Sequence, residues 1–210
     1  MKMFRLFVVV PGLVVGLGLF PSSSRCALLP VSNPSFESPA VGDGDYTYGV
    51  TDWVGDRIGV DDFTAGSSAF VEGYDDGDDQ NILFVQDGHS ATHNIGTILA
   101  NNQYTLSVDV GRRNDFGDGA TYTIALSANG TTVVSEVRDE TEMQLGHFER
   151  RSISFTSPVS GGVVGQTLAI EFEAVDGQAN FDDVELDATP VPEPANLLFL
   201  AVIALLARRR

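Results

Sequence analysis

The chain has 210 residues, of which 29 are Asp or Glu and 12 are Lys or Arg, so its formal net charge is −17. Residues 31–190 hold 28 of these acids against six Arg and no Lys, a net charge of −22. Such a field repels phosphate backbones and excludes nucleic-acid binding. The 22 Gly residues and the lack of a long helical period exclude a helical bundle and favour one all-β domain.

The first 27 residues have the order of a secretory signal peptide. Lys2 and Arg5 precede the apolar stretch 6–20, and small polar residues follow at 22–24. We therefore predict that residues 1–27 direct export and are removed. Cys26 is the only cysteine and would leave with them, so the exported domain would form no disulfide within itself.

Residues 31–188 are predicted to form one domain of short strands separated by Gly, Asn and Asp turns. Apolar and polar residues alternate in 104–110 and 167–173, which is the period of a strand with one buried face. Asn129-Gly130 between 121–127 and 131–137 predicts an antiparallel hairpin. The other predicted strands are 82–86, 91–98, 148–155 and 180–187. Side chains predicted to face the core are Tyr104, Leu106, Val108, Val110, Tyr122, Ile124, Leu126, Leu168, Ile170 and Phe172. The pattern predicts a jelly-roll β-sandwich of two antiparallel sheets.

Residues 189–210 form a tripartite end: Val191-Pro192-Glu193-Pro194, the apolar run 195–207, and three arginines. The apolar run is shorter than the roughly 20 residues that span a bilayer comfortably, and a weak tail anchor is one interpretation. This order also resembles a PEP-CTERM sorting signal. The resemblance implies a short hydrophobic helix that holds the chain transiently in the membrane. It further implies cleavage at Pro192, Glu193 and Pro194 by an exosortase-type protease of bacteria that make exopolysaccharide, and a cell-surface or extracellular location.

Four further segments, taken in order, resemble the carbohydrate-binding-module jelly rolls of the galactose-binding-like superfamily. They are Asn33-Pro34-Ser35-Phe36-Glu37, Trp53, the strand 104–110 and the closing stretch 180–186. The resemblance implies adjacent first and last strands and a structural calcium ion held by Glu37 and by Asp182 or Asp183, with Asp183 the preferred ligand. A hard cation takes oxygen ligands of this kind. Solvated acids at strand ends are the alternative.

Residues 98–113 and 180–184 also resemble the corresponding stretches of the cyanobacterial Stig cyclases. Those enzymes are calcium-dependent jelly rolls that rearrange and cyclise indole-isonitrile terpenoids. The resemblance implies that Asp182 or Asp183 acts as a general acid.

Aromatic residues in polar surroundings are the candidates for a sugar-binding surface, because an aromatic ring stacks on the apolar face of a pyranose. They are Trp53, Tyr74, Tyr46, Tyr48 and Phe116. For Trp53 a place in the core is the alternative.

The main hypothesis from sequence is an exported, exosortase-sorted surface or matrix protein whose noncatalytic β-sandwich binds polysaccharide or extracellular matrix. Two alternatives stay open: a calcium-dependent enzyme similar to the Stig cyclases, and a purely structural matrix protein. Exposed aromatics in one groove would favour the binding module. A deep aromatic pocket over Asp182 or Asp183 would favour the enzyme.

Overall fold

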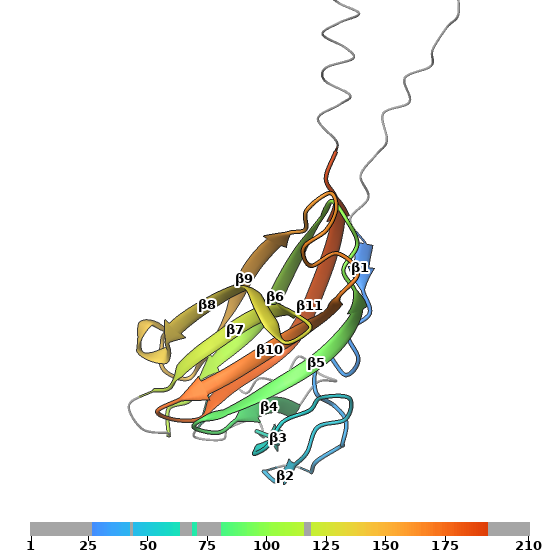
Figure 1. Cartoon of the computed structure of the whole chain (residues 1–210). Coiled ribbons are helices and arrows are strands. Elements are labelled where there is room, and N and C mark those ends of the chain that lie inside the picture. Colours follow the sequence, from blue (N-terminus) through green and yellow to red (C-terminus); the bar gives the residue numbers. More distant parts are fainter. Residues whose placement is uncertain (1–26, 43, 64–68, 71–80, 116–118, 193–210) are drawn as a thin grey trace, which may run out of the picture.

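A computed structural model of the chain describes residues 27–42, 44–63, 69–70, 81–115 and 119–192 (Figure 1). The predicted signal peptide and the hydrophobic C-terminal segment therefore lie almost entirely outside the described residues. In chain order the elements are β1 (Ala27–Leu29), β2 (Tyr46–Tyr48), β3 (Ile58–Asp62), β4 (Asn81–Val85), β5 (His89–Thr97), β6 (Asn102–Arg112), β7 (Thr121–Ala128), β8 (Thr131–Asp139), the 3₁₀ helix η1 (Glu140–Glu142), β9 (His147–Thr156), β10 (Thr167–Val175) and β11 (Ala179–Pro190). No helix within these ranges is long and apolar enough to cross a membrane.

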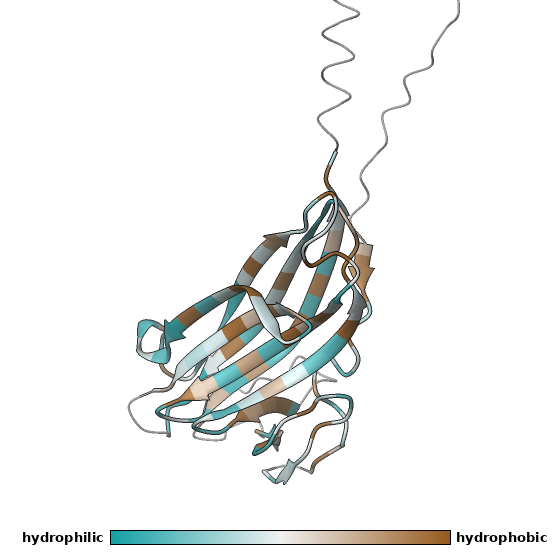
Figure 2. Ribbon diagram, in the orientation of Figure 1, coloured by the Kyte–Doolittle hydropathy of each residue, from teal (hydrophilic) through white to brown (hydrophobic). Residues whose placement is uncertain are grey.

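Two antiparallel sheets pack face to face, as the sequence predicted. One has the strand order β2-β3-β4-β11-β6-β9, with β1 also paired to β11, and the other has the order β5-β10-β7-β8. Figure 2 shows the brown and teal bands that alternate along many of these strands. The alternation buries one face of each sheet against the other and produces a jelly-roll-like sandwich.

The predicted strands and core positions are confirmed. The ten side chains predicted to face the core are all at most 1% exposed. β7 and β8 pair through the Asn129-Gly130 turn, in which both residues have positive φ angles of 47° and 77°. Two positive φ values in succession are those of a type I′ hairpin turn, which suits the twist of the flanking strands.

The opening segment of the domain fills a gap in the large sheet. β11 pairs with β4 at residues 179–181 and with β1 at residues 186–188, which leaves the bulged stretch between them without a strand partner on that side. Pro34 O accepts a hydrogen bond from Val184 N there at 3.0 Å. The first and last parts of the domain are therefore adjacent.

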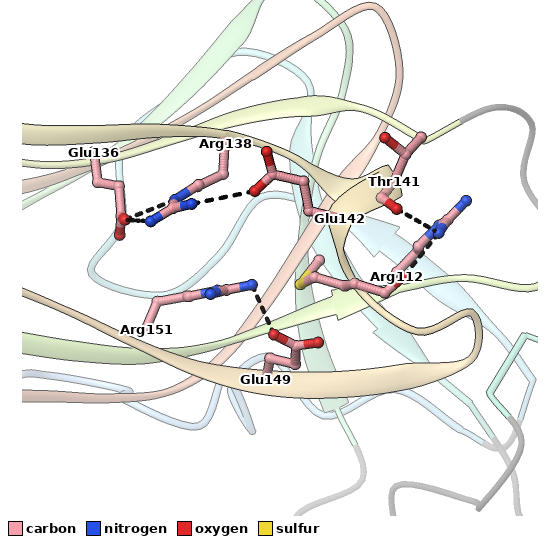
Figure 3. Close-up of polar contacts among 8 residues, drawn as sticks. Arg112, Glu136, Arg138, Thr141, Glu142, Glu149 and Arg151 are labelled. Atoms are coloured by element: carbon pink, nitrogen blue, oxygen red, sulfur yellow. Dashed lines mark hydrogen bonds and ion pairs between the residues drawn. The ribbon is translucent and has the colours of Figure 1, made fainter.

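A charged network lies where the edges of the two sheets meet. β8 and β9 are edge strands of different sheets and lie beside each other. Figure 3 shows Arg138 between Glu136 and Glu142, with ion-pair distances of 2.7 Å and 3.2 Å, and Arg151 beside Glu149 at 2.7 Å. Charged edges of this kind oppose pairing with another chain.

Glu140, in η1 near this network, is buried with only 3% exposure. Its Oε2 accepts a hydrogen bond from Ala120 N at 3.0 Å, and Arg112 beside it donates to Thr141 O and Met143 O. Burial raises the pKa of Glu140 from 4.5 to about 7, although the hydrogen bond from Ala120 and the charge of Arg112 oppose that rise. The folded protein therefore favours the protonated carboxyl group.

We expect Glu140→Gln to stabilise the protein at pH 8 by on the order of 3 kcal/mol and to change little at pH 4. Because the pKa of Glu140 is higher in the folded than in the unfolded protein, its protonation contributes fully to stability below about pH 4.5. This contribution is lost as the pH rises through about 7. Gln stays neutral and can still accept the Ala120 hydrogen bond. Urea unfolding at several pH values measures the effect. Glu142→Gln on the exposed side of the same turn is the control, and an unchanged pH slope in Glu140→Gln would contradict the prediction.

Candidate functional site

The outer face of the large sheet is buried over β4 and β11. Phe181, Leu83 and Val110 are paired neighbours in the core between the sheets. Because side chains alternate along a strand, the residues beside them face outward. An outer face is commonly solvated, yet these outward side chains are at most 2% exposed: Ile82, Phe84, Asn180 and Asp182.

Two glycines make room for aromatic rings on this face. Gly59 pairs with Phe84, and a Cβ at Gly59 would collide with the Phe84 ring and with Thr47 O. Gly111 pairs with Phe148, and a Cβ there would lie 2.6 Å from that ring. Each ring therefore lies over the backbone of the neighbouring strand. Glycine is needed at these two strand positions because a larger residue would displace the ring.

Further aromatic rings extend the surface in both directions. Tyr46 and Tyr48 lie on the β2 side, with the Tyr48 ring centroid 5.6 Å from that of Phe84. On the β9 side, the centroids of Phe70 and Phe148 are 4.7 Å apart, and Ile82 packs in the same cluster. The outer face thus carries an aromatic surface that runs across several strands.

Asp182 is a fully buried carboxyl group on this face, at 0% exposure. It pairs with Asp109 of β6, and its Oδ1 accepts a hydrogen bond from Asp183 N at 2.8 Å. Since the preceding residue pairs with Leu83, Asp182 lies next to Ile82 of the aromatic cluster. The Asp182 carboxyl group is therefore buried beside apolar neighbours on this face.

A second acid, Asp61 of β3, pairs with Ile82 on its other side. Its Oδ2 lies 3.4 Å from Arg113 Nη1, and Arg113 also contacts Asp115 at 2.9 Å. The Arg113 guanidinium lies over the Phe63 ring, 4.5 Å from its centroid. Burial raises the pKa of Asp61 to about 6, although the charge of Arg113 opposes that rise. The hydrogen bond from Arg113 lowers the pKa of Asp115.

The arrangement suits proton transfer to an apolar ligand. Strands in a sheet are about 4.8 Å apart, so the backbones of Asp61 and Asp182 lie roughly 10 Å apart on either side of β4. A pKa near 6 keeps a useful fraction of Asp61 protonated close to neutral pH. Aromatic faces also stabilise a positive charge that develops above them.

Glu37 lies at the start of β4, beside the gap in the sheet. Its Oε1 and Oε2 accept hydrogen bonds from Asn81 N and Asn81 Nδ2 at 2.8 Å and 3.0 Å. Asp62 pairs with Asn81 and is buried. Among the described residues, the buried Oδ1 of Asn81 has no hydrogen-bond partner, and no group of three or more His, Cys, Asp or Glu could hold a metal.

Asp183 lies in the irregular stretch of β11 at the same gap. It lines a cavity of about 360 Å³ together with Pro34, Ser35 and residues of β1. The structure thus brings the opening segment with Glu37 and the last strand with Asp183 to the same gap. Asp182 and Asp183 lie on one strand but in different surroundings.

The predicted aromatic candidates separate into three groups. Tyr46 and Tyr48 are 63% and 52% exposed and lie together on β2. Trp53 is 5% exposed and its ring stacks on Phe172 in the core. It is therefore a core residue, which was the alternative to a sugar-binding role. Tyr74 and Phe116 lie outside the described residues.

The predicted processing residues are at the limit of what the structure describes. Glu193 and Pro194 lie outside the described residues, and Pro192 follows β11 at the end of the described range.

Sequence reasoning did not single out Asp61, Phe84, Arg113 or Phe148. A signal for Phe84 is visible in the chain: residues 81–85 read Asn-Ile-Leu-Phe-Val, a short continuous apolar run rather than an alternation. Such a run is typical of a strand covered on both faces. It indicates that something packs on the outer face, but not which side chains.

The profile of the HpiC1-like family, described as HpiC1 cyclase, matches residues 27–187. No curated protein sequence matches the chain.

Solved structures of cyclases are similar to it in fold. The Stig cyclase Fisc from Fischerella sp. TAU, in complex with (3Z)-3-(1-methyl-2-pyrrolidinylidene)-3H-indole, is 20% identical, with a TM-score of 0.67 over 80% of this chain and 100% of the other. A cyclase from the same organism, in complex with 4-(1H-indol-3-yl)butan-2-one, is 19% identical, with a TM-score of 0.66 and the same coverage. These likenesses show a shared fold.

Proposed function

This chain belongs to the HpiC1 cyclase family, and we propose that it is an enzyme that rearranges or cyclises an apolar, indole-bearing substrate by acid catalysis. The observation that carries the proposal is the fully buried Asp182 carboxyl group on an outer face covered by aromatic rings. Family membership supports an enzyme better than it supports a noncatalytic carbohydrate-binding module.

In the proposed reaction, the Asp182 carboxyl group donates its proton to an electron-rich carbon of the substrate. The cation that forms is stabilised by the faces of rings such as Phe84 and Phe148. An intramolecular π bond then attacks the cationic carbon to close a ring, and loss of a proton to the carboxylate restores the acid. The product is an isomer of the substrate, so the step needs no oxidant or reductant.

Asp182 suits this role better than Asp183. Asp182 lies on the aromatic outer face, whereas Asp183 has a positive φ of 48° in the bulge and lines the cavity beside β1. Asp61 is a second acid on the same face, and its raised pKa of about 6 allows it to relay or supply a proton.

The test is incubation of the purified protein with indole-bearing isonitrile terpenoids, followed by chromatography and mass spectrometry. We expect an isomer of unchanged mass to form faster than without protein. Unchanged substrate across a panel of such compounds, with the protein folded and calcium present, would contradict the proposal.

We also propose that a calcium ion binds in the gap between β1 and β4. The donor chemistry fits, because Glu37 and Asp183 supply carboxylates and the buried Asn81 Oδ1 is an amide oxygen without a hydrogen-bond partner among the described residues. A hard cation takes six to eight oxygens, so backbone carbonyls of the opening segment would complete the set. The ion would hold the first and last parts of the domain together.

Chelation of calcium is therefore expected to lower the free energy of unfolding by roughly 2.7 kcal/mol, if free calcium starts a hundredfold above its dissociation constant. Glu37→Gln should remove this calcium-dependent part. Asp56→Asn, at an exposed acid outside the gap, should keep it. Thermal unfolding with and without a chelator measures the difference, and an equal response from both variants would rule out Glu37 as a ligand.

Export and sorting are proposed on the basis of the two ends of the sequence. We expect a C-terminally tagged full-length chain to lose its tag in a host with an exosortase-type protease. Replacing Pro192, Glu193 and Pro194 by Ala should preserve the tag. A mature surface form of the unaltered chain that still carries the tag would indicate a permanent tail anchor instead.

A further inference from the structure

A polar groove lies at the end of the sandwich where β3 begins and β4 ends. One cavity, of about 330 Å³, is lined by Arg57, Gln86, Asp87, His89, Gly177 and Gln178. A second, of about 470 Å³, is lined by Tyr48, Gly49, Gly55, Asp56, Arg57 and Ile58. Arg57 lines both cavities, so they are adjacent, and the second extends to Tyr48. We refer to the two together as the groove.

Arg57 is held in an unusual backbone conformation at the centre of this groove. Its φ is +53°, in the left-handed region that a long side chain rarely adopts. The backbone is fixed there by a hydrogen bond from Gln86 N to Arg57 O at 3.3 Å. Conformations of this kind persist where the surrounding structure enforces them, often at binding sites.

The side chains around Arg57 form a set of hydrogen-bonding groups held in place by one another. Gln86 accepts from Arg57 Nη1 at 3.4 Å and donates to Tyr48 Oη at 2.9 Å. Gln178 donates to Asn180 Oδ1 at 3.1 Å, and Asp87 Oδ1 accepts from a backbone N–H of the facing turn. A guanidinium carries five N–H donors and an amide two, so these groups retain capacity for a ligand.

An exposed aromatic ring borders the groove. Tyr48 is 52% exposed, and Tyr46 beside it is 63% exposed with its ring centroid 6.0 Å away. The Tyr48 ring is supported by Phe84 and its hydroxyl by Gln86. A large ring that is exposed and yet fixed in orientation is a surface on which a ligand can stack.

We propose that this groove binds a neutral saccharide unit. Its apolar face stacks on Tyr48, and Arg57, Gln86, Asp87 and Gln178 hydrogen-bond its hydroxyl groups. Both signs of charge are present, because Asp87 lines the first cavity, Asp56 lines the second and Arg57 lines both, which favours a neutral ligand with many hydroxyls over an anion. The groove meets the aromatic outer face at Tyr48, but Asp182 lines neither cavity, so saccharide binding is expected not to depend on the proposed cyclase activity.

The test is affinity electrophoresis of the full chain in native gels that contain dextran, galactan or xylan, with alginate as the anionic comparison. We expect retardation by at least one neutral polysaccharide and at least about tenfold weaker retention by Tyr48→Ala and Gln86→Ala, since one lost contact of about 1.4 kcal/mol changes affinity tenfold. Tyr48→Phe keeps the ring and should retain most of the binding.

Two control variants test whether binding is confined to this groove. Val137→Ala, at an exposed position on β8 of the other sheet, should bind like the unaltered chain. Asp182→Asn should also bind normally, even if it has lost catalytic activity. No retardation by any neutral polysaccharide, retardation by alginate alone, or full retention by a folded Tyr48→Ala would each overturn the proposal.

Discussion

Replacement of Asp182 by Asn should slow isomer formation by about 10²- to 10⁴-fold, the usual contribution of a general acid. Asn has nearly the shape of Asp but no carboxyl proton to donate. The change should therefore affect turnover far more than the fold, which circular dichroism can check. Initial rates with a substrate that the unaltered enzyme converts provide the measurement.

Two further variants make that experiment specific. Asp61→Asn should have the smaller effect on rate if Asp61 assists rather than donates the proton. Glu173→Gln, on β10 of the other sheet, should leave the rate unchanged. A full rate in Asp182→Asn, or a larger loss in Asp61→Asn than in Asp182→Asn, would show that Asp182 is not the general acid.

Trp53→Ala is expected to lower the free energy of unfolding by about 3 to 5 kcal/mol, the range for removal of a large aromatic side chain from a core. The indole is stacked on Phe172 at 5.3 Å and on His93 at 5.1 Å between ring centroids. Its Nε1 donates to Ser32 O at 3.2 Å. Removing the ring creates a cavity in the core and also removes the hydrogen bond to Ser32 O.

Urea unfolding of Trp53→Ala, followed by circular dichroism, measures this loss. Val54→Ala is a matched control, because the neighbouring side chain is 74% exposed and should change stability by no more than about 0.5 kcal/mol. Similar small losses in both variants would show that the Trp53 ring does not contribute to the core as the structure indicates.

Much of the sandwich could be predicted from the sequence, because its signals are local. Residues such as Leu106 and Val108 alternate with polar neighbours, and that two-residue period alone assigns them to a buried strand face. Asn129-Gly130 specifies a hairpin through its own backbone preferences. Strands β1, β2 and β3 were not predicted, since three residues, or a run as mixed as Ile58–Asp62, carry too little periodicity.

The site depended on contacts between residues far apart in the chain. Asp182 was identified by resemblance, but only the pairing of β11 with β4 and β6 places it on the aromatic outer face, distinct from Asp183. The raised pKa of Asp61 comes from its burial and from the charges around it, which no local pattern reports.

The sequence by itself therefore determined the strands β4 to β11 and the core-facing side chains of those that alternate, because backbone preference and side-chain alternation act over a few residues. Only the tertiary structure decided that Trp53 is a core residue, that Tyr48 is an exposed one, and that Asp61 and Asp182 share a face. The physical reason is that burial and electrostatic environment are set by the neighbours that strand pairing brings together across the chain.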